Sequence, residues 1–72
     1  MAAVELAREL RTLRGERGLS MREVCKRAPL SLSRYLEFEQ AKVNQPRVVT
    51  LRRLADVFEV PPERLMRAAG YL

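Results

Sequence analysis

The amino-acid sequence predicts an all-α fold, a compact five-helix bundle that forms a single domain over residues 1–72. Apolar residues recur at spacings of three and four along most of the chain, which is typical of amphipathic helices with one buried face. No stretch alternates apolar and polar residues for long enough to predict a β-strand. Because a lone amphipathic helix of about ten residues is only marginally stable in water, the five short helices must pack against one another.

The first helix is expected at about residues 3–15. Leu6, Leu10 and Leu13 follow one another at spacings of four and three, which places them on one face of a helix. Gly18 lies just beyond this pattern, and a glycine commonly follows the last turn of a helix. The stripe of leucines therefore predicts the side of the first helix that faces the core.

The second helix is expected to begin with a capping box. Ser20 offers the cap and Glu23 lies three residues later, so the serine oxygen can accept a backbone amide while the glutamate reaches back. Pro29 ends the helix, since the residue before a proline is pushed out of the α region. We interpret Cys25 as a small buried residue, with a redox sensor as the alternative. The predicted buried face consists of Met21, Val24, Cys25 and Ala28.

The third helix is expected to start after a cap at Ser31 and to run to about Gln40. Tyr35 and Phe38 are three residues apart and are predicted to face inward. The following segment, AKVNQPR, reads as a polar loop because asparagine and proline are turn residues.

A fourth helix is expected from about Val48 to Phe58, and a fifth begins at the VPP sequence. Proline is tolerated in the first turn of a helix, where its missing amide would be unpaired anyway. Gly70 closes the fifth helix. The apolar positions of the fourth helix are Leu51, Leu54, Ala55 and Phe58, and Leu65, Met66 and Ala69 line the fifth.

The composition is basic and favours an intracellular chain. Lys and Arg total 14 against 9 Asp and Glu, a net charge of +5. Arginine offers a fork of donors suited to phosphate and guanine, so we expect a polyanionic partner, with a merely solvated basic surface as the alternative. No His and a single Cys leave too few ligands for a zinc site and no internal disulfide. Without a signal-peptide core or an apolar run of about 20 residues, we expect a cytoplasmic chain with no metal or cofactor.

The second and third predicted helices are separated by only about three residues, which forces the sharp angle of a helix-turn-helix at about residues 20–40. The sequence from Leu13 to Leu65 resembles the lambda-repressor-like, or Xre/Cro-type, helix-turn-helix domain. The resemblance rests on the RGLS start of the second helix, the spacing from Ser31 to Glu39, the loop ending in Pro46, and the segment TLRRLADVFEVPPERLM. In such domains the third helix enters the major groove of DNA.

The resemblance implies roles for particular residues. Glu39 is expected to pair with Arg14 as a structural ion pair rather than to contact DNA. Arg47 lies where some relatives place an arginine in a narrow minor groove. The implied base-reading candidates are Leu32, Ser33, Arg34 and Glu37, and the implied DNA-backbone candidates are Met21, Arg22, Lys42, Asn44, Gln45 and Arg47.

Four positions depart from the family pattern. Met21 replaces a glutamine that binds phosphate, and Pro29 replaces a glycine of positive φ, so this turn is expected to be built differently. Ala41 also replaces a glycine, and a left-handed alanine costs about 1 kcal/mol. Leu36 replaces a polar residue, so Leu32 and Leu36 are predicted to form a small exposed apolar patch, unless the third helix is rotated and buries them.

The sequence thus favours a sequence-specific DNA-binding transcriptional regulator, a repressor, that binds double-stranded DNA as a homodimer. The alternative is a protein-interaction module, a phage- or plasmid-type antagonist or an antitoxin, that uses Leu32 and Leu36. An enzyme is not predicted, since the chain has no His and no glycine-rich phosphate loop. The dimer-surface candidates are Leu65, Met66, Tyr71 and Leu72, although the last two residues alternatively fold back onto the core.

Overall fold

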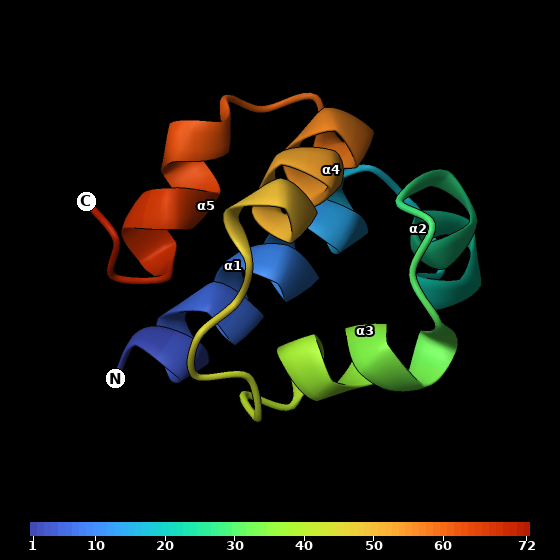
Figure 1. The fold of residues 1–72 in the computed structure, drawn as a ribbon. Helices are drawn as coiled ribbons and strands as arrows, with labels where there is room; N and C mark the ends of the chain where they lie inside the picture. The colour runs from blue at the N-terminus through green and yellow to red at the C-terminus, as the bar shows by residue number, and fades with distance from the viewer.

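Five α-helices form the structure, a computed structural model that describes all of residues 1–72 (Figure 1). They are α1 (Ala2–Glu16), α2 (Met21–Arg27), α3 (Leu32–Glu39), α4 (Val48–Phe58) and α5 (Pro62–Ala68). The predicted all-α architecture is confirmed, and each helix begins and ends close to its expected position. None of the helices is both long and apolar enough to cross a membrane.

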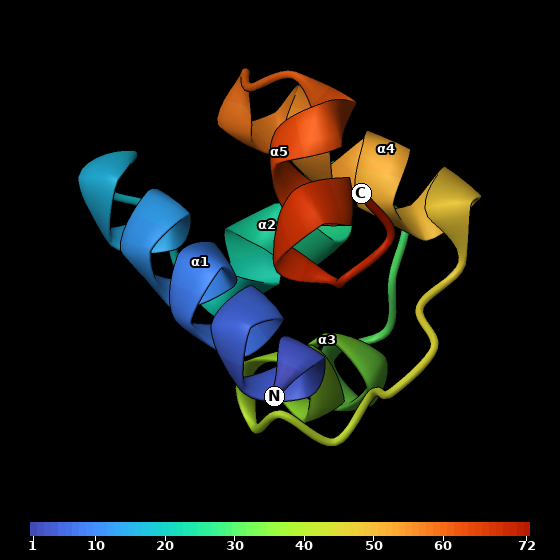
Figure 2. The same cartoon turned by 90° about the vertical axis from the view of Figure 1, so that its left-hand side faces the viewer.

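The longest helix, α1, packs against α3 and α5, while α4 packs against α5 and α2. Figure 2 shows both chain termini on the same side of the molecule, where α1 begins and α5 ends. The helices enclose one core, because the apolar stripe of each helix faces the others. Its largest fully buried side chains are Leu6, Leu10 and Leu13 of α1, Tyr35 and Phe38 of α3, Leu51, Leu54 and Phe58 of α4, and Leu65 of α5.

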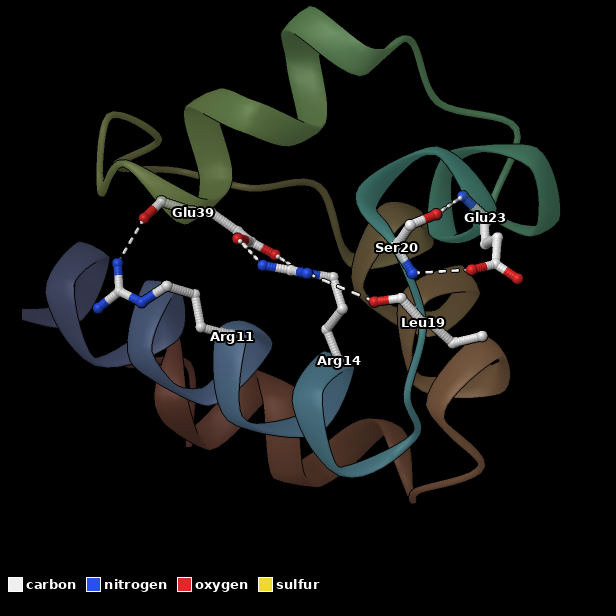
Figure 3. Close-up of polar contacts among 6 residues, drawn as sticks. All are labelled: Arg11, Arg14, Leu19, Ser20, Glu23 and Glu39. Atoms are coloured by element: carbon white, nitrogen blue, oxygen red, sulfur yellow. Dashed lines mark hydrogen bonds and ion pairs between the residues drawn. The ribbon is translucent and has the colours of Figure 1, made fainter.

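Serine side chains cap the two helices that follow α1, as the sequence predicted. The Glu23 backbone N–H donates to Ser20 Oγ at 3.1 Å, and the Ser20 N–H donates to Glu23 Oε1 at 2.9 Å (Figure 3). Ser31 Oγ accepts a hydrogen bond from the Arg34 N–H at 3.1 Å. Each cap satisfies an N–H that has no partner within its own helix.

All five helices end in the same way, at one residue with positive φ: Gly18 (65°), Pro29 (20°), Ala41 (60°), Glu59 (57°) and Gly70 (83°). The N–H of the next residue donates in each case to the carbonyl five residues before it, as in a Schellman motif. Glycine adopts this conformation freely, whereas a left-handed residue with a Cβ costs about 1 kcal/mol. The expected left-handed alanine is therefore confirmed at Ala41, and Glu59 carries the same strain.

The turn at Pro29 is only partly as predicted. Pro29 has no N–H, so the second bond of the motif is missing and only the 3.1 Å bond from Leu30 N–H to the Cys25 carbonyl closes the turn. Pro29 lies at φ 20°, a lower value than the 57–83° of the other four helix ends. The pyrrolidine ring favours about −65°. The turn therefore keeps one bond of the motif and a positive φ, but it differs from the other four ends in its missing bond and in the size of φ.

Candidate nucleic-acid interface

Helix α3 lies at one edge of the molecule, with no other helix outside it in either view (Figures 1 and 2). Its inner side is held by Tyr35 and Phe38, which are 0% and 1% exposed. Because these two residues are three apart, they lie on the same side of α3. The opposite side of the helix packs against no other helix. The exposed residues of that side are Ser33, Arg34, Leu36 and Glu37.

Two arginines of α1 bind the carboxyl end of α3 and hold it in place (Figure 3). Arg14 donates from Nε and Nη2 to the two Glu39 carboxylate oxygens at 2.7 and 3.0 Å, and Arg11 Nη1 donates to the Glu39 carbonyl at 2.8 Å. Arg14 Nη1 also reaches the Leu19 carbonyl at 3.4 Å, directly before the cap of α2. The expected ion pair is therefore present. It links the end of α3 to the start of α2 and so orients both helices.

The charges of this cluster support each other. The hydrogen bond from Arg14 to Glu39 raises the pKa of Arg14, so the guanidinium stays charged throughout the physiological range. Glu39 is only 6% exposed, and positive side chains at the carboxyl end of α3 complement the helix dipole. These contacts therefore fix the carboxyl end of α3 against α1.

The hydroxyl of Tyr35 lies beside this ion pair without a hydrogen-bond partner. The side chain is fully buried, and burial, together with the neighbouring Glu39 carboxylate, raises the pKa of Tyr35 well above its usual value. An unsatisfied buried polar group costs about 1–3 kcal/mol. The ring thus fills the core, and its hydroxyl lies un-ionised beside Glu39 and Arg14.

The predicted apolar patch of Leu32 and Leu36 forms only in part. Leu36 is 36% exposed, but Leu32 is half-buried and packs against the core. Leu32 lies in the first turn of α3 and lines a groove together with Leu30 and residues of α2, a contact that the spacing of four did not reveal. Leu36 is therefore the one large apolar side chain that α3 exposes.

Helix α2 contributes one exposed basic residue at its start. Arg22 is exposed, whereas Met21 is half-buried and packs against the core. The Met21 side chain thus makes an apolar contact, and Arg22 is the cationic side chain of this turn. Arg22 also borders a shallow groove of about 460 Å³, together with Glu23, Cys25, Lys26, Leu30 and Leu32.

Cys25 is one of the residues that line this groove and is 9% exposed. Its thiol lies 3.7 Å from the Ser31 carbonyl, to which it can donate. Burial raises the pKa of the thiol, so little thiolate forms at neutral pH. These features agree with the interpretation of Cys25 as a small buried residue.

The loop that follows α3 has apolar residues that pack inward and polar residues that face the solvent. Val43 and Pro46 are buried, and the Tyr71 hydroxyl donates to the Pro46 carbonyl at 2.5 Å. The C-terminal tail therefore holds the loop in place. The four loop residues implied as DNA-backbone contacts, Lys42, Asn44, Gln45 and Arg47, are all exposed.

The C-terminal residues divide between the core and the surface. Leu65 is 0% exposed, so its expected place on a dimer surface is wrong: the helix turns this side chain toward α1 and α4. Met66 is half-buried. Tyr71 and Leu72 are 40% and 62% exposed, although the Tyr71 hydroxyl bonds back to the loop.

Comparison with known proteins agrees with this geometry. Residues 5–69 match the family of helix-turn-helix domains. The chain belongs to this family. Two curated relatives from Bacillus subtilis (strain 168) are similar over 64 residues, 89% of this chain: the HTH-type transcriptional repressor RghR at 33% identity and the uncharacterized HTH-type transcriptional regulator RghRB at 34%. The chain covers 47% and 46% of these two proteins, about half their length. No solved structure matches the chain.

Within this helix-turn-helix domain, the structure adds residues that sequence reasoning missed. Arg11 binds the Glu39 carbonyl, and Tyr71 holds the loop at Pro46. Arg11 lies three residues before Arg14 on the same face of α1, a spacing that points to this contact. The Tyr71 contact joins segments 25 residues apart and has no local sequence signal.

Proposed function

We propose that this chain is the DNA-binding domain of a transcriptional regulator, a repressor, which places the exposed side of α3 in the major groove of double-stranded DNA. The observation that carries the proposal is the arrangement of exposed side chains. Ser33, Arg34 and Glu37 cover the outer side of α3, and basic residues lie beside both of its ends. Ser33 can donate to or accept from a base edge. The names of the two relatives, a repressor and a regulator of the same domain family, support this function.

The backbone contacts proposed for this domain come from both sides of α3. Arg22 stands at the start of α2 and lines the same groove as Leu32 of α3, and Arg47 ends the loop that follows α3. Phosphate contacts of this kind fix the orientation of a protein on the duplex, while groove contacts read the sequence. We propose the cytoplasm as its compartment, because both relatives are regulators from a bacterium, Bacillus subtilis, whose DNA lies there.

The test is fluorescence anisotropy with a labelled pool of duplexes at two salt concentrations. Arg22→Ala and Arg47→Ala should each weaken binding to all sequences and reduce the slope of log K against log salt by about 0.9. Arg17→Ala is the matched control, because Arg17 is also exposed but pairs with Glu59, away from α3 and from the loop that follows it. Absence of binding at low salt from a folded protein would refute the proposal, as would an equal effect of all three substitutions.

We propose further that the domain binds DNA as a homodimer, since one such domain reads only a short site and regulators of this type recognise paired half-sites. The proposed surface includes Met66, Tyr71 and Leu72, of which the last two are substantially exposed. Leu72→Glu should lower the affinity for a palindromic site and shift the mass measured by sedimentation toward the monomer. An unchanged mass and affinity would exclude this surface.

A protein partner is the second candidate, and the exposed Leu36 is the observation that favours it. Leu36→Ala distinguishes the two functions. The substitution should leave DNA binding within about twofold if α3 reads bases through polar groups, because an exposed leucine contributes little to such contacts. If the folded domain binds no duplex, Leu36 becomes the first residue to test in a search for a protein partner.

A further inference from the structure

Arg34 is held in place by two contacts on its own helix. Its Nη1 donates to Glu37 Oε1 at 3.2 Å, and its guanidinium carbon lies 5.2 Å from the centre of the Phe38 ring. Phe38 is 1% exposed, so the ring is fixed in the core. The backbone is fixed as well, because the Arg34 N–H donates to the Ser31 cap. A long side chain that normally samples many rotamers is thereby restricted to one face of α3.

The pair leaves hydrogen-bonding groups free on both partners. The Arg34 and Glu37 side chains are 46% and 48% exposed. Their contact uses one guanidinium nitrogen and one carboxylate oxygen, and the remaining polar atoms of both side chains form no hydrogen bond within the chain. The edge of the guanidinium formed by Nε and Nη2 is therefore available, and so is Glu37 Oε2.

The pair carries no net charge, which separates it from the other basic residues of this face. A free arginine attracts phosphate regardless of sequence, because binding releases the counterions of the DNA. An arginine neutralised by a neighbouring carboxylate contributes much less to that attraction. The Glu37 carboxylate repels phosphates unless a donor meets it. Any contribution of this pair to the free energy of DNA binding must therefore come from contacts with base edges rather than with the phosphate backbone.

We propose that Arg34 and Glu37 act as one charge-neutral recognition unit that reads a guanine and a neighbouring cytosine in the major groove. This inference rests on the proposed function. The free guanidinium edge donates to O6 and N7 of guanine, and the free carboxylate oxygen accepts from N4 of cytosine. Three residues of helix advance by about 4.5 Å, close to the spacing of about 3.4 Å between successive base pairs along a strand. The two groups therefore meet adjacent base pairs.

In this unit Glu37 gives specificity through repulsion as well as attraction. A guanine or thymine at the second position presents no hydrogen-bond donor to the carboxylate and leaves its charge desolvated beside the DNA. Discrimination of this kind raises the energy of wrong complexes more than it lowers that of the right one. Glu37 is thus a specificity-determining residue, and Arg34 is the residue whose orientation it sets.

The experiment is selection of binding sites from a randomised duplex pool, followed by affinity measurements on the selected site and its single-base variants. The wild type should select adjacent guanine and cytosine. Glu37→Gln should keep the guanine and lose about tenfold in preference for the cytosine, while Arg34→Lys should lose about tenfold in preference for the guanine. Glu59→Gln is the control, since it removes the same charge from an exposed pair with Arg17 elsewhere on the surface and should leave both preferences unchanged.

Three results would overturn the inference, and each differs from a failure of the proposed function. The first is that the wild type selects sites without adjacent guanine and cytosine. The second is that Glu37→Gln binds every sequence more tightly with unchanged base preferences. The third is that Glu59→Gln changes the base preferences as much as Glu37→Gln does. Each of these results leaves DNA binding itself intact. A folded wild type that binds no duplex at all refutes the proposed function together with this inference.

Discussion

Arg14→Met should destabilise the domain by about 3 kcal/mol, because it leaves the Glu39 carboxylate without a partner. Glu39 is 6% exposed and accepts hydrogen bonds of 2.7 and 3.0 Å from Arg14. Removing one partner of a buried ion pair costs about 3–5 kcal/mol. The Arg14 side chain is 25% exposed, so water reaches part of the vacated space and the lower end of that range applies. A domain of this size has a total stability of roughly 4–11 kcal/mol, so this loss is a large fraction of it.

The assay is thermal and urea unfolding followed by far-ultraviolet circular dichroism. A loss of about 3 kcal/mol corresponds to a decrease in Tm of roughly 12–24 °C for a domain of this length. Arg17→Met is the matched control. Arg17 makes a 3.5 Å contact with Glu59, and both side chains of that pair are exposed. The control should therefore change the free energy of unfolding by no more than about 0.5 kcal/mol.

A double variant separates the unpaired charge from the loss of the contact. Arg14→Met combined with Glu39→Leu removes both charges, so the free energy of unfolding should return to within about 1 kcal/mol of the wild type. If the double variant is as unstable as Arg14→Met alone, the cost does not arise from a stranded carboxylate. If Arg14→Met and Arg17→Met have equal effects, the buried pair has no special role, and the reasoning is refuted on either result.

Three further predictions concern strain, burial and pH. Ala41→Gly should stabilise the domain by about 0.5–1 kcal/mol, because the left-handed position at φ 60° suits glycine, and a lower urea midpoint would contradict this. Tyr35→Phe should leave the free energy of unfolding unchanged or raise it, because the buried hydroxyl has no partner, whereas a loss above about 1 kcal/mol would show that the hydroxyl is bonded. The hydrogen bond from the Ser20 backbone lowers the pKa of Glu23 from its ordinary 4.5. The contribution of the Glu23 carboxylate to the free energy of unfolding is therefore present above that value. It is lost as the pH falls through the lower folded-state pKa of Glu23. Urea midpoints measured against pH should decline less steeply below pH 4.5 for Glu23→Gln than for the wild type, and parallel curves would contradict the capping role.

The fold was largely predictable because its signals are local. The Ser20 capping box and the Ser31 cap mark the helix starts, and periodic leucines mark the buried faces. These signals lie within a few residues of one another, so no knowledge of the tertiary arrangement is needed to interpret them. The Arg14–Glu39 pair was implied by the family resemblance, since its two residues are 25 apart.

The features that sequence did not predict depend on how each helix is rotated in the assembled core. Leu65 and Leu32 are apolar residues on helices with more than one apolar face, and only the packing of neighbouring elements decides which face is covered. The contact between Arg34, Glu37 and Phe38 depends on side-chain rotamers, and that between Tyr71 and Pro46 depends on where two distant segments meet. Pro29 was misjudged in part because the surrounding helices hold the turn at positive φ despite the ring.

Titration of the ¹⁵N-labelled domain with a selected duplex, followed by NMR, tests the central claim most directly. If α3 enters the major groove, the largest chemical-shift changes fall on the exposed side of α3, at Arg22, and in the loop up to Arg47. Amides of the buried core and those around Arg17 and Glu59 change little. Changes centred on α5, with α3 unaffected, would contradict this account of how the domain binds DNA.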